Sequence, residues 1–301
     1  MGQHLKGALF ILLSACGFGV MPVFALHAYP RGINVPTLLL LRFTLAGLLL
    51  FGFLFASPRY RAAMKMRAVD LFYLFLLGIC YTLQSTLYFT AVRHITPTLV
   101  ALLFYTYPIL VVALNCLLER RKPSLSTAVA GAVSFMGVLL ILGTTWGSAD
   151  GVGTLLAFSA ALVYVVYILL GHRVIKQIPP LIATTFITVF AGMGVLATSI
   201  FTGPLDFSFE PSAWGPIAVL VLFSTITALL AFFRGLEMLG PARASILSMS
   251  EPLFTALGAA IMLQERLTAV QLIGGAAVLA GAVLISWTGR ERPCQGSALE
   301  R

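Results

Sequence analysis

The chain alternates between long apolar runs and short polar connections. A helix needs about 20 apolar residues to cross the hydrocarbon core of a bilayer, and every run is close to that length. The pattern therefore predicts ten membrane-spanning helices joined by short loops. We expect them over residues 7–28, 36–56, 70–92, 98–118, 125–143, 151–171, 181–202, 214–236, 243–264 and 267–287.

The composition indicates the same class of protein. Of the 301 residues, 59% are hydrophobic and 10% are charged, whereas about 25% of the residues of a soluble domain are charged. No polar segment is long enough to fold as a soluble domain, so the lipid bilayer is the expected environment. The first run is too long for the apolar core of a cleaved signal peptide and is expected to be a retained helix. The prediction is an all-α polytopic membrane protein.

The basic residues predict the orientation. Cytoplasmic loops of membrane proteins carry an excess of lysine and arginine. With the N-terminus in the cytoplasm, 14 of the 19 Lys and Arg residues fall on cytoplasmic segments and three fall on outer loops. We therefore expect a multi-pass protein of the inner or plasma membrane with both termini in the cytoplasm. The net charge of +9 comes mainly from short loops, so no nucleic-acid partner is expected.

An internal repeat divides the chain into two halves. Four residues of the first half recur in the second at a constant offset of 144 positions. The pairs are Pro97 and Pro241, Pro108 and Pro252, Gly131 and Gly275, and Gly137 and Gly281. Each half holds five spans, an odd number, so the second half must cross the membrane upside down relative to the first. We expect a first five-helix repeat over 1–146, a second, inverted repeat over 147–290, and a polar cytoplasmic tail over 291–301.

Residues 235–285 carry the motifs of a known family. The segment has Glu251-Pro252 in mid-helix, a turn with a Glu-Arg pair, and a glycine-rich last helix. It resembles the second repeat of the drug/metabolite transporter superfamily, EamA type. Gln264 departs from the pattern, because the family often has glycine at this position.

The first half shows a weaker form of the same resemblance. Residues 91–114 are similar to the family's first repeat, and Pro36 with Arg42 resembles the start of its second helix. The resemblance implies a ten-helix secondary transporter. It does not imply one substrate, because the superfamily carries amino acids, nucleotide sugars, cationic drugs and other metabolites.

Glu251 is the one carboxylate well inside an apolar run. It lies about 12 Å deep at ~1.5 Å per residue, and a charge inside a bilayer costs about 2.5–3.5 kcal/mol on insertion scales. One hypothesis is that Glu251 lines a cavity and binds a substrate amine or carries a proton. The alternative is that the protonated or hydrogen-bonded side chain stabilises the backbone opened by Pro252. Ser248 shares its helix face, and Tyr107 is its counterpart in the first repeat.

The third span carries a polar and aromatic stripe. Its members, at i, i+3, i+4 and i+7, are Tyr81, Gln84, Ser85 and Tyr88. Lipid would reject the Gln84 amide, so this face is expected to point into the protein, as a substrate-binding wall or as an ordinary helix-packing surface. We favour the binding wall, with Tyr164 and Tyr167 of the sixth span as weaker candidates. The central cavity is expected between spans 1, 3, 4, 6, 8 and 9, with spans 5 and 10 outside it.

Prolines, arginines and glycines give further expectations. Pro22, Pro108 and Pro252 lie within runs and are expected to kink them, because proline removes a backbone donor. Arg42 and Arg234 lie near span ends, where their side chains are expected to snorkel to the surface. Glycines of the fifth and tenth spans permit close packing, within one chain or across a dimer. The protein is therefore expected as a monomer or a homodimer.

The candidate chemistry excludes several function classes. The spans have no deep histidine, and no residues stand at metal-ligand spacing, so no enzyme, metal site or cofactor is expected. No glycine-rich phosphate loop indicates an ATPase, and no filter or ring of charges indicates a channel. A secondary transporter of a small-molecule substrate, working by alternating access, is the remaining prediction.

The residues expected around the cavity also favour a substrate class. They offer phenols, hydroxyls, one amide and one carboxylate, without the lysines or paired arginines that phosphorylated sugars require. Small amphipathic metabolites fit better, and we predict export or facilitated exchange of amino acids, aromatic or neutral. The alternative is proton-coupled export of cationic or lipophilic drugs, with Glu251 as the coupling or cation-binding carboxylate.

Overall fold

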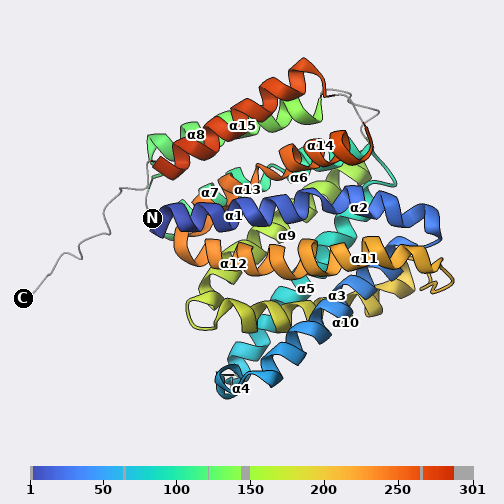
Figure 1. Ribbon diagram of the computed structural model, residues 1–301. Helices are drawn as coiled ribbons and strands as arrows, with labels where there is room; N and C mark the ends of the chain where they lie inside the picture. Colours follow the sequence, from blue (N-terminus) through green and yellow to red (C-terminus); the bar gives the residue numbers. More distant parts are fainter. Residues whose placement is uncertain (1–2, 64–65, 121, 144–149, 265–266, 288–301) are drawn as a thin grey trace, which may run out of the picture.

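The computed structural model describes residues 3–63, 66–120, 122–143, 150–264 and 267–287 (Figure 1). Ten helical segments in these ranges are long and apolar enough to cross a membrane, and the same ranges contain no β-strand. The predicted all-α fold with ten spans is confirmed.

Each repeat contributes five spans. The first repeat has α1 with α2 and a 3-10 turn (Gln3–Gly19, Met21–Ala28, Tyr29–Arg31), α3 (Val35–Ala56), the short α4 (Pro58–Ala63), α5 (Ala68–Ala91), α6 with α7 (Pro97–Phe104, Tyr107–Leu118) and α8 (Leu125–Leu142). The second has α9 (Gly151–Ile175), α10 (Pro180–Thr202), the eighth span, α13 with α14 (Pro241–Ser248, Glu251–Met262) and α15 (Ala269–Trp287). The eighth span joins a 3-10 turn (Pro211–Ala213), α11 (Trp214–Val221), a π-helical segment (Leu222–Thr227) and α12 (Ala228–Leu239).

Short polar side chains set where several spans begin. At five helix starts a side-chain oxygen accepts a hydrogen bond from the backbone N–H three residues further on, which satisfies one of the free donors of the first turn. These capping residues are Asn34, Thr96, Ser124, Asp150 and Thr268. Proline stands in the first turn after Asn34 and Thr96, where its missing N–H costs no hydrogen bond.

The two repeats interlock across the centre of the molecule. Helix α1 of the first repeat packs against α12 of the second. The pair that corresponds to it when the repeats are exchanged, α9 with α5, packs in the same way. The second span packs against the seventh (α3 with α10) and the fifth against the tenth (α8 with α15). Exchanging the repeats leaves this set of pairs unchanged, as a pseudo-two-fold axis requires.

Helices α8 and α15 form a separate pair along one side of the bundle (Figure 1). Glycines let their backbones touch. A Cβ atom on Gly137 would lie 2.6 Å from the Gly274 carbonyl oxygen, and a Cβ atom on Gly274 would lie 2.7 Å from the Gly137 carbonyl oxygen. These two glycines therefore serve packing within one chain, which decides between the two uses that the sequence left open for them.

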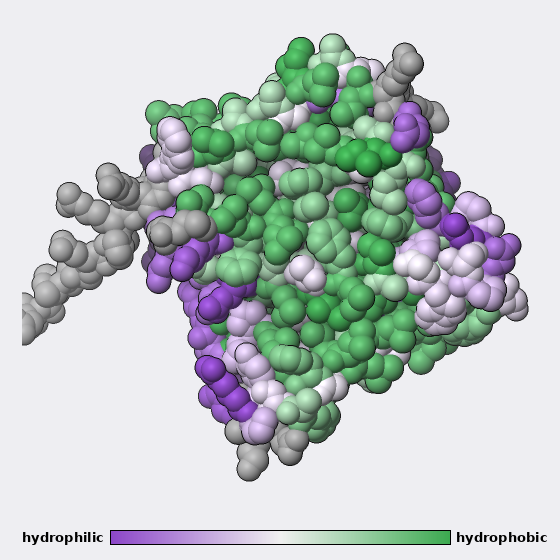
Figure 2. All heavy atoms as spheres, in the orientation of Figure 1, coloured by the Kyte–Doolittle hydropathy of each residue, from purple (hydrophilic) through white to green (hydrophobic). Residues whose placement is uncertain are grey.

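The surface shows how the bundle meets its environment. Figure 2 shows an apolar band over the middle of the helices, with hydrophilic residues gathered toward the helix ends on both sides. Large apolar side chains such as Leu48, Leu125 and Ile261 are exposed. An exposed apolar surface of this extent is typical of a face that contacts lipid.

Candidate functional site

Three spans are interrupted in their middle. The first breaks between Gly19 and Met21, the fourth between Phe104 and Tyr107, and the ninth between Ser248 and Glu251. Each break directly precedes one of the prolines expected to kink the chain, Pro22, Pro108 and Pro252, and each proline is the second residue of the helix that follows. Proline cannot donate the hydrogen bond that would continue the preceding helix.

The eighth span is interrupted in a different way, and no proline stands in the interrupted segment. Residues Leu222–Thr227 form a π-helical segment, and the Thr225 hydroxyl donates a hydrogen bond of 2.7 Å to the Leu220 carbonyl, five residues back. Such π-segments occur frequently at functional sites. The sequence pattern gave no sign of this segment.

Two of these breaks and the π-segment meet at one place. A Cβ atom on Gly19 would lie 2.6 Å from the Glu251 carbonyl oxygen, and one on Gly17 would lie 3.0 Å from the Phe223 carbonyl oxygen. The end of α1 thus runs against the break of the ninth span and the π-segment with no room for a side chain. The irregular backbone of spans 1, 8 and 9 is concentrated at the centre.

Seven aromatic rings pack together beside these breaks. We call them the aromatic cluster, and its members are Tyr81, Tyr88, Phe104, Tyr105, Tyr107, Tyr164 and Tyr167. Tyr81 stacks on Tyr167 with ring centroids 5.4 Å apart, and Tyr107 meets Tyr164 edge-on at 4.7 Å. The rings come from α5, α6, α7 and α9 and from the break between α6 and α7, so both repeats build the cluster.

Glu251 lies against the aromatic cluster. It is half-buried and is the first residue of α14, where the helix dipole favours a negative charge. The Glu251 carboxylate interacts with the phenols of Tyr88, Tyr105, Tyr107 and Tyr164. These contacts suit both hypotheses for Glu251, because the hydroxyls that solvate the carboxylate also give the site a polar lining.

Ser248 lies one turn before Glu251 and is buried. Its hydroxyl donates to the Ala244 carbonyl at 2.9 Å and also interacts with the Tyr107 phenol. Through Tyr107, Ser248 joins the break of the ninth span to the break of the fourth. Tyr107 and Glu251, which correspond under the repeat, are therefore parts of one site.

Arg42 corrects an expectation from the sequence. It does not snorkel to the surface: only 4% of the residue is exposed. Its Nε donates to the Thr225 hydroxyl at 2.8 Å, its Nη2 donates to the Tyr81 hydroxyl at 2.8 Å, and its Nη1 contacts the Met21 sulfur. The depth of Arg42 along the sequence suggested a surface position, but its face of α3 turns toward the protein interior, where three spans offer acceptors.

Arg234 behaves as expected. It lies in the last part of α12, about half of its side chain is exposed, and it forms an ion pair of 2.7 Å with Glu237. The contrast with Arg42 shows that distance from a span end is a weaker guide than the helix face. The signal that was available for Arg42 is the stripe opposite it, since Tyr81 requires a hydrogen-bonding partner when buried.

The rest of the stripe is buried or half-buried and lies beside the aromatic cluster. Gln84 is 8% exposed and accepts a hydrogen bond from the Ser85 hydroxyl at 3.4 Å, while Tyr88 packs edge-on against Phe104. Tyr105, Arg42 and Thr225 also join this site, although the sequence pattern did not indicate them.

Two hollows lie away from the cluster, toward one end of the bundle. One, of about 650 Å³, is lined by residues of α1, α4, α10 and α12, including Arg59, Pro179 and Arg234. The other, of about 200 Å³, is lined by residues that include Asp70 and Gln177. No residue of the stripe lines either hollow.

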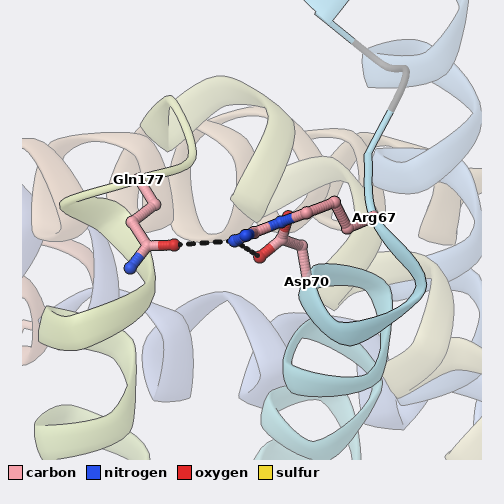
Figure 3. A network of polar contacts seen from close by, with 3 residues as sticks. All are labelled: Arg67, Asp70 and Gln177. Atoms are coloured by element: carbon pink, nitrogen blue, oxygen red, sulfur yellow. Dashed lines mark hydrogen bonds and ion pairs between the residues drawn. The ribbon is translucent and has the colours of Figure 1, made fainter.

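Loops of the two repeats meet at this same end, which we call the Arg67 end. The Arg67 guanidinium makes two hydrogen bonds to Asp70, of 3.0 and 3.1 Å, and a third of 3.2 Å to the Gln177 amide oxygen (Figure 3). Arg67 precedes α5 and Gln177 follows α9, so this contact joins the loop between spans 2 and 3 to the loop between spans 6 and 7.

The opposite end, which we call the Arg31 end, has the corresponding contact in inverted form. The Glu210 N–H donates to the Arg31 carbonyl at 2.9 Å, the Asn34 amide donates to the Pro204 carbonyl at 2.9 Å, and the Asp206 N–H donates to the Thr37 hydroxyl at 2.8 Å. These bonds join the loop between spans 1 and 2 to the loop between spans 7 and 8. The aromatic cluster is thus covered at both ends by contacts between the repeats.

Ten apolar spans in two interlocked repeats, with broken helices, the buried Arg42 and the half-buried Glu251, define a membrane transporter of the inverted-repeat type. The chain belongs to the EamA-like transporter family, whose model matches residues 5–143 and 151–287, five spans in each segment.

Relatives agree with this assignment. The uncharacterized transporter YcbK of Bacillus subtilis is 25% identical over 96% of this chain and 94% of its own length. The threonine/homoserine exporter RhtA of Salmonella typhimurium is 28% identical over 87% of this chain and 85% of its own length. A crystal structure of a protein with 18% sequence identity matches with a TM-score of 0.79, covering 94% of this chain and 97% of that chain, and so shares the fold.

Proposed function

We propose that this protein is a secondary carrier of amino acids, aromatic or neutral, which it exports or exchanges across the plasma membrane by alternating access. The observation that carries the proposal is the aromatic cluster with Glu251 against it, built by both repeats where helices are broken. A site shared by two inverted repeats can be opened to either side by moving one repeat against the other.

The chemistry of the cluster fits a small amphipathic substrate. Phenol rings offer apolar area and polar tips, which suit an amino-acid side chain. The Glu251 carboxylate offers a partner for the substrate ammonium, and tyrosine faces attract the same cation. The relative named as a threonine/homoserine exporter supports amino acids as the substrate class.

Orientation is part of the proposal. The excess of lysine and arginine in alternate loops places both termini and the Arg67 end in the cytoplasm, and the Arg31 end outside. We also propose that the carrier is a facilitator or exchanger, so that Glu251 binds substrate and does not carry the driving proton.

Counterflow in proteoliposomes tests the proposed function. Vesicles with the purified protein are loaded with one unlabelled amino acid at a time, and uptake of its labelled form is followed across an aromatic and an aliphatic series. We expect saturable exchange that falls by tenfold or more in Glu251→Gln, since a charge-assisted hydrogen bond contributes about 1.5–3 kcal/mol. Glu237→Gln, which alters a carboxylate near the end of α12, is the matched control and should retain exchange.

The same vesicles distinguish the alternatives. Exchange of a lipophilic cation in the absence of any amino-acid exchange would replace the proposal by drug export. A pH gradient that drives wild-type uptake, but does not drive uptake by Glu251→Gln, would replace the facilitator by a proton-coupled carrier.

A further inference from the structure

Arg42 is a buried cation without a buried anionic partner. Its guanidinium contacts a hydroxyl, a phenol and a thioether and lies 4.8 Å from the centroid of the Phe43 ring, and all of these groups are neutral. The ion pairs found among the described residues do not include Arg42. A charge is costly in the membrane interior. Arginine cannot avoid that cost by losing its proton, because guanidinium stays charged in proteins.

Arg42 and Glu251 both interact with the same phenol, that of Tyr81. Tyr81 accepts the hydrogen bond from Arg42 and also lies in electrostatic range of Glu251. The two charges attract each other but form no direct ion pair. A cation and an anion that are not paired with each other, and that both interact with one phenol, complement the two charges of a zwitterion.

The surroundings of Arg42 hold its guanidinium in place. Thr225 lies in the π-segment, and its hydroxyl donates to Leu220 while it accepts from Arg42 Nε, so both roles of the hydroxyl are used. Tyr81 fixes one terminal nitrogen. The third contact is different in kind, because the Met21 sulfur is a weak acceptor and belongs to the break of the first span.

The repeat supports a functional reason for Arg42. The packing contacts recur in both halves, but the position that corresponds to Arg42 at the offset of 144 holds Phe186. A group needed for packing the pseudo-symmetric bundle would be expected twice. The first repeat contributes the cation, Arg42, and the second contributes the carboxylate, Glu251. This asymmetry allows a ligand with two different ends to bind in one orientation.

We propose that Arg42 binds the carboxylate of the transported substrate, with Thr225 and Tyr81 as the residues that position the guanidinium. The Met21 sulfur then holds, in this closed structure, the place that a carboxylate oxygen takes when substrate is bound. Arginine's planar fork pairs with both oxygens of a carboxylate, and Glu251 receives the ammonium. The inference rests on the proposed function and narrows it to amino acids in which both charged groups are free.

The test compares three ligands that differ only at the carboxylate. Counterflow by the wild-type protein is inhibited with an amino acid, its amide, and the amine formed by its decarboxylation. We expect the amino acid to inhibit about 10- to 100-fold better than the amide, because a hydrogen-bonded charge is lost. The amide keeps the ammonium, so its binding to Glu251 is unchanged.

Variants then locate the preference. Arg42→Gln should lose the preference for the acid over the amide, while Arg42→Lys, which keeps the charge without the fork, should retain part of it. Thr225→Val should weaken acid binding more than amide binding. Arg234→Gln, which alters an arginine of the same chain away from the cluster, is the control and should keep the wild-type ratio.

The outcomes distinguish a failure of the role of Arg42 from a failure of the proposed function. A wild-type protein that exchanges amino acids but binds acid and amide equally would overturn the role of Arg42 and leave the proposed function standing. A wild-type protein that exchanges no amino acid would overturn both. The wild-type ligand series needs no variant, so the inference remains testable even where Arg42→Gln fails to fold.

Discussion

The two ends of the molecule close over the aromatic cluster in different ways. At the Arg31 end three hydrogen bonds join the repeats, and backbone groups take part in all of them. Apolar residues reinforce this contact, with Ile33 and Leu38 of the first repeat in one buried group with Ala213 and Ile217 of the second. At the Arg67 end the hydrogen bond between the loops is a side-chain contact from Arg67 to Gln177, and the Arg67 side chain is 73% exposed.

The difference between the contacts at the two ends indicates which end should open more readily. A hydrogen bond between exposed side chains contributes little, because water competes for both groups. Both hollows also lie toward the Arg67 end, so less packing must be broken there. The structure is thus closed at both ends but fastened chiefly at the Arg31 end, and we expect the resting protein to open toward the Arg67 end.

The largest expected effect is the presence or absence of cysteine labelling, which shows which end faces the cytoplasm. Ser57 follows α3 on the Arg67 side, and Ser208 lies exposed in the loop at the Arg31 end. In a protein freed of native cysteines, Ser208→Cys should react with a membrane-impermeant maleimide added to intact cells, and Ser57→Cys should react only after the cells are opened. Labelling of both from outside would contradict the topology, and the reverse pattern would invert it.

The next prediction weakens the Arg31 end. Asn34→Ala together with Thr37→Val removes two bonds between the repeats, each contributing about 1 kcal/mol. The outward-open population should rise by roughly 10- to 30-fold. Labelling of a Ser85→Cys reporter from outside measures it, since Ser85 lies half-buried in the stripe. Ser199→Ala is the control, because its hydroxyl bonds only within α10 at Leu196; equal labelling in both would exclude a fastening role for the two bonds.

A smaller effect is expected at Gly32, the turn residue of the same end. Its φ is +89°, a left-handed conformation that costs a residue with a Cβ about 1–2 kcal/mol. Gly32→Ala should therefore raise labelling of the Ser85→Cys reporter from outside by about fivefold or more. Gly52→Ala is the control, because nothing lies within 4 Å of a Cβ atom added there. No change at Gly32 would mean that the turn does not help to fasten this end.

The architecture was predictable from the sequence because its signals are local. Apolar runs gave the spans, since a bilayer sets their length, and the helix breaks fall where Pro22, Pro108 and Pro252 predict a loss of backbone hydrogen bonds. The stripe at i, i+3, i+4 and i+7 identified an inward face in the same way. Each of these properties depends on residues within a few turns of one another.

The features that escaped prediction depend on distant residues. Arg42 is buried because Thr225, 183 residues later, offers an acceptor, and no property of its own span indicates this. The π-segment of the eighth span has no proline to mark it. The contacts among the rings of the aromatic cluster also depend on packing between spans, so the sequence indicated several of its members but not which rings would touch.

The smallest expected effect is at the Arg67 end. It tests most directly whether the repeats are joined less strongly there than at the Arg31 end. Gln177→Ala removes the acceptor of an exposed Arg67, so the labelling of Ser85→Cys from the cytoplasmic face of inside-out vesicles should rise by at most about twofold. High salt should have a similarly small effect, because it screens the same exposed charges. Lys176→Ala, at the neighbouring exposed position, serves as the control. If Gln177→Ala instead raised labelling as much as the double variant does at the Arg31 end, the two ends would be equally fastened, and the preference for opening toward the Arg67 end would be wrong.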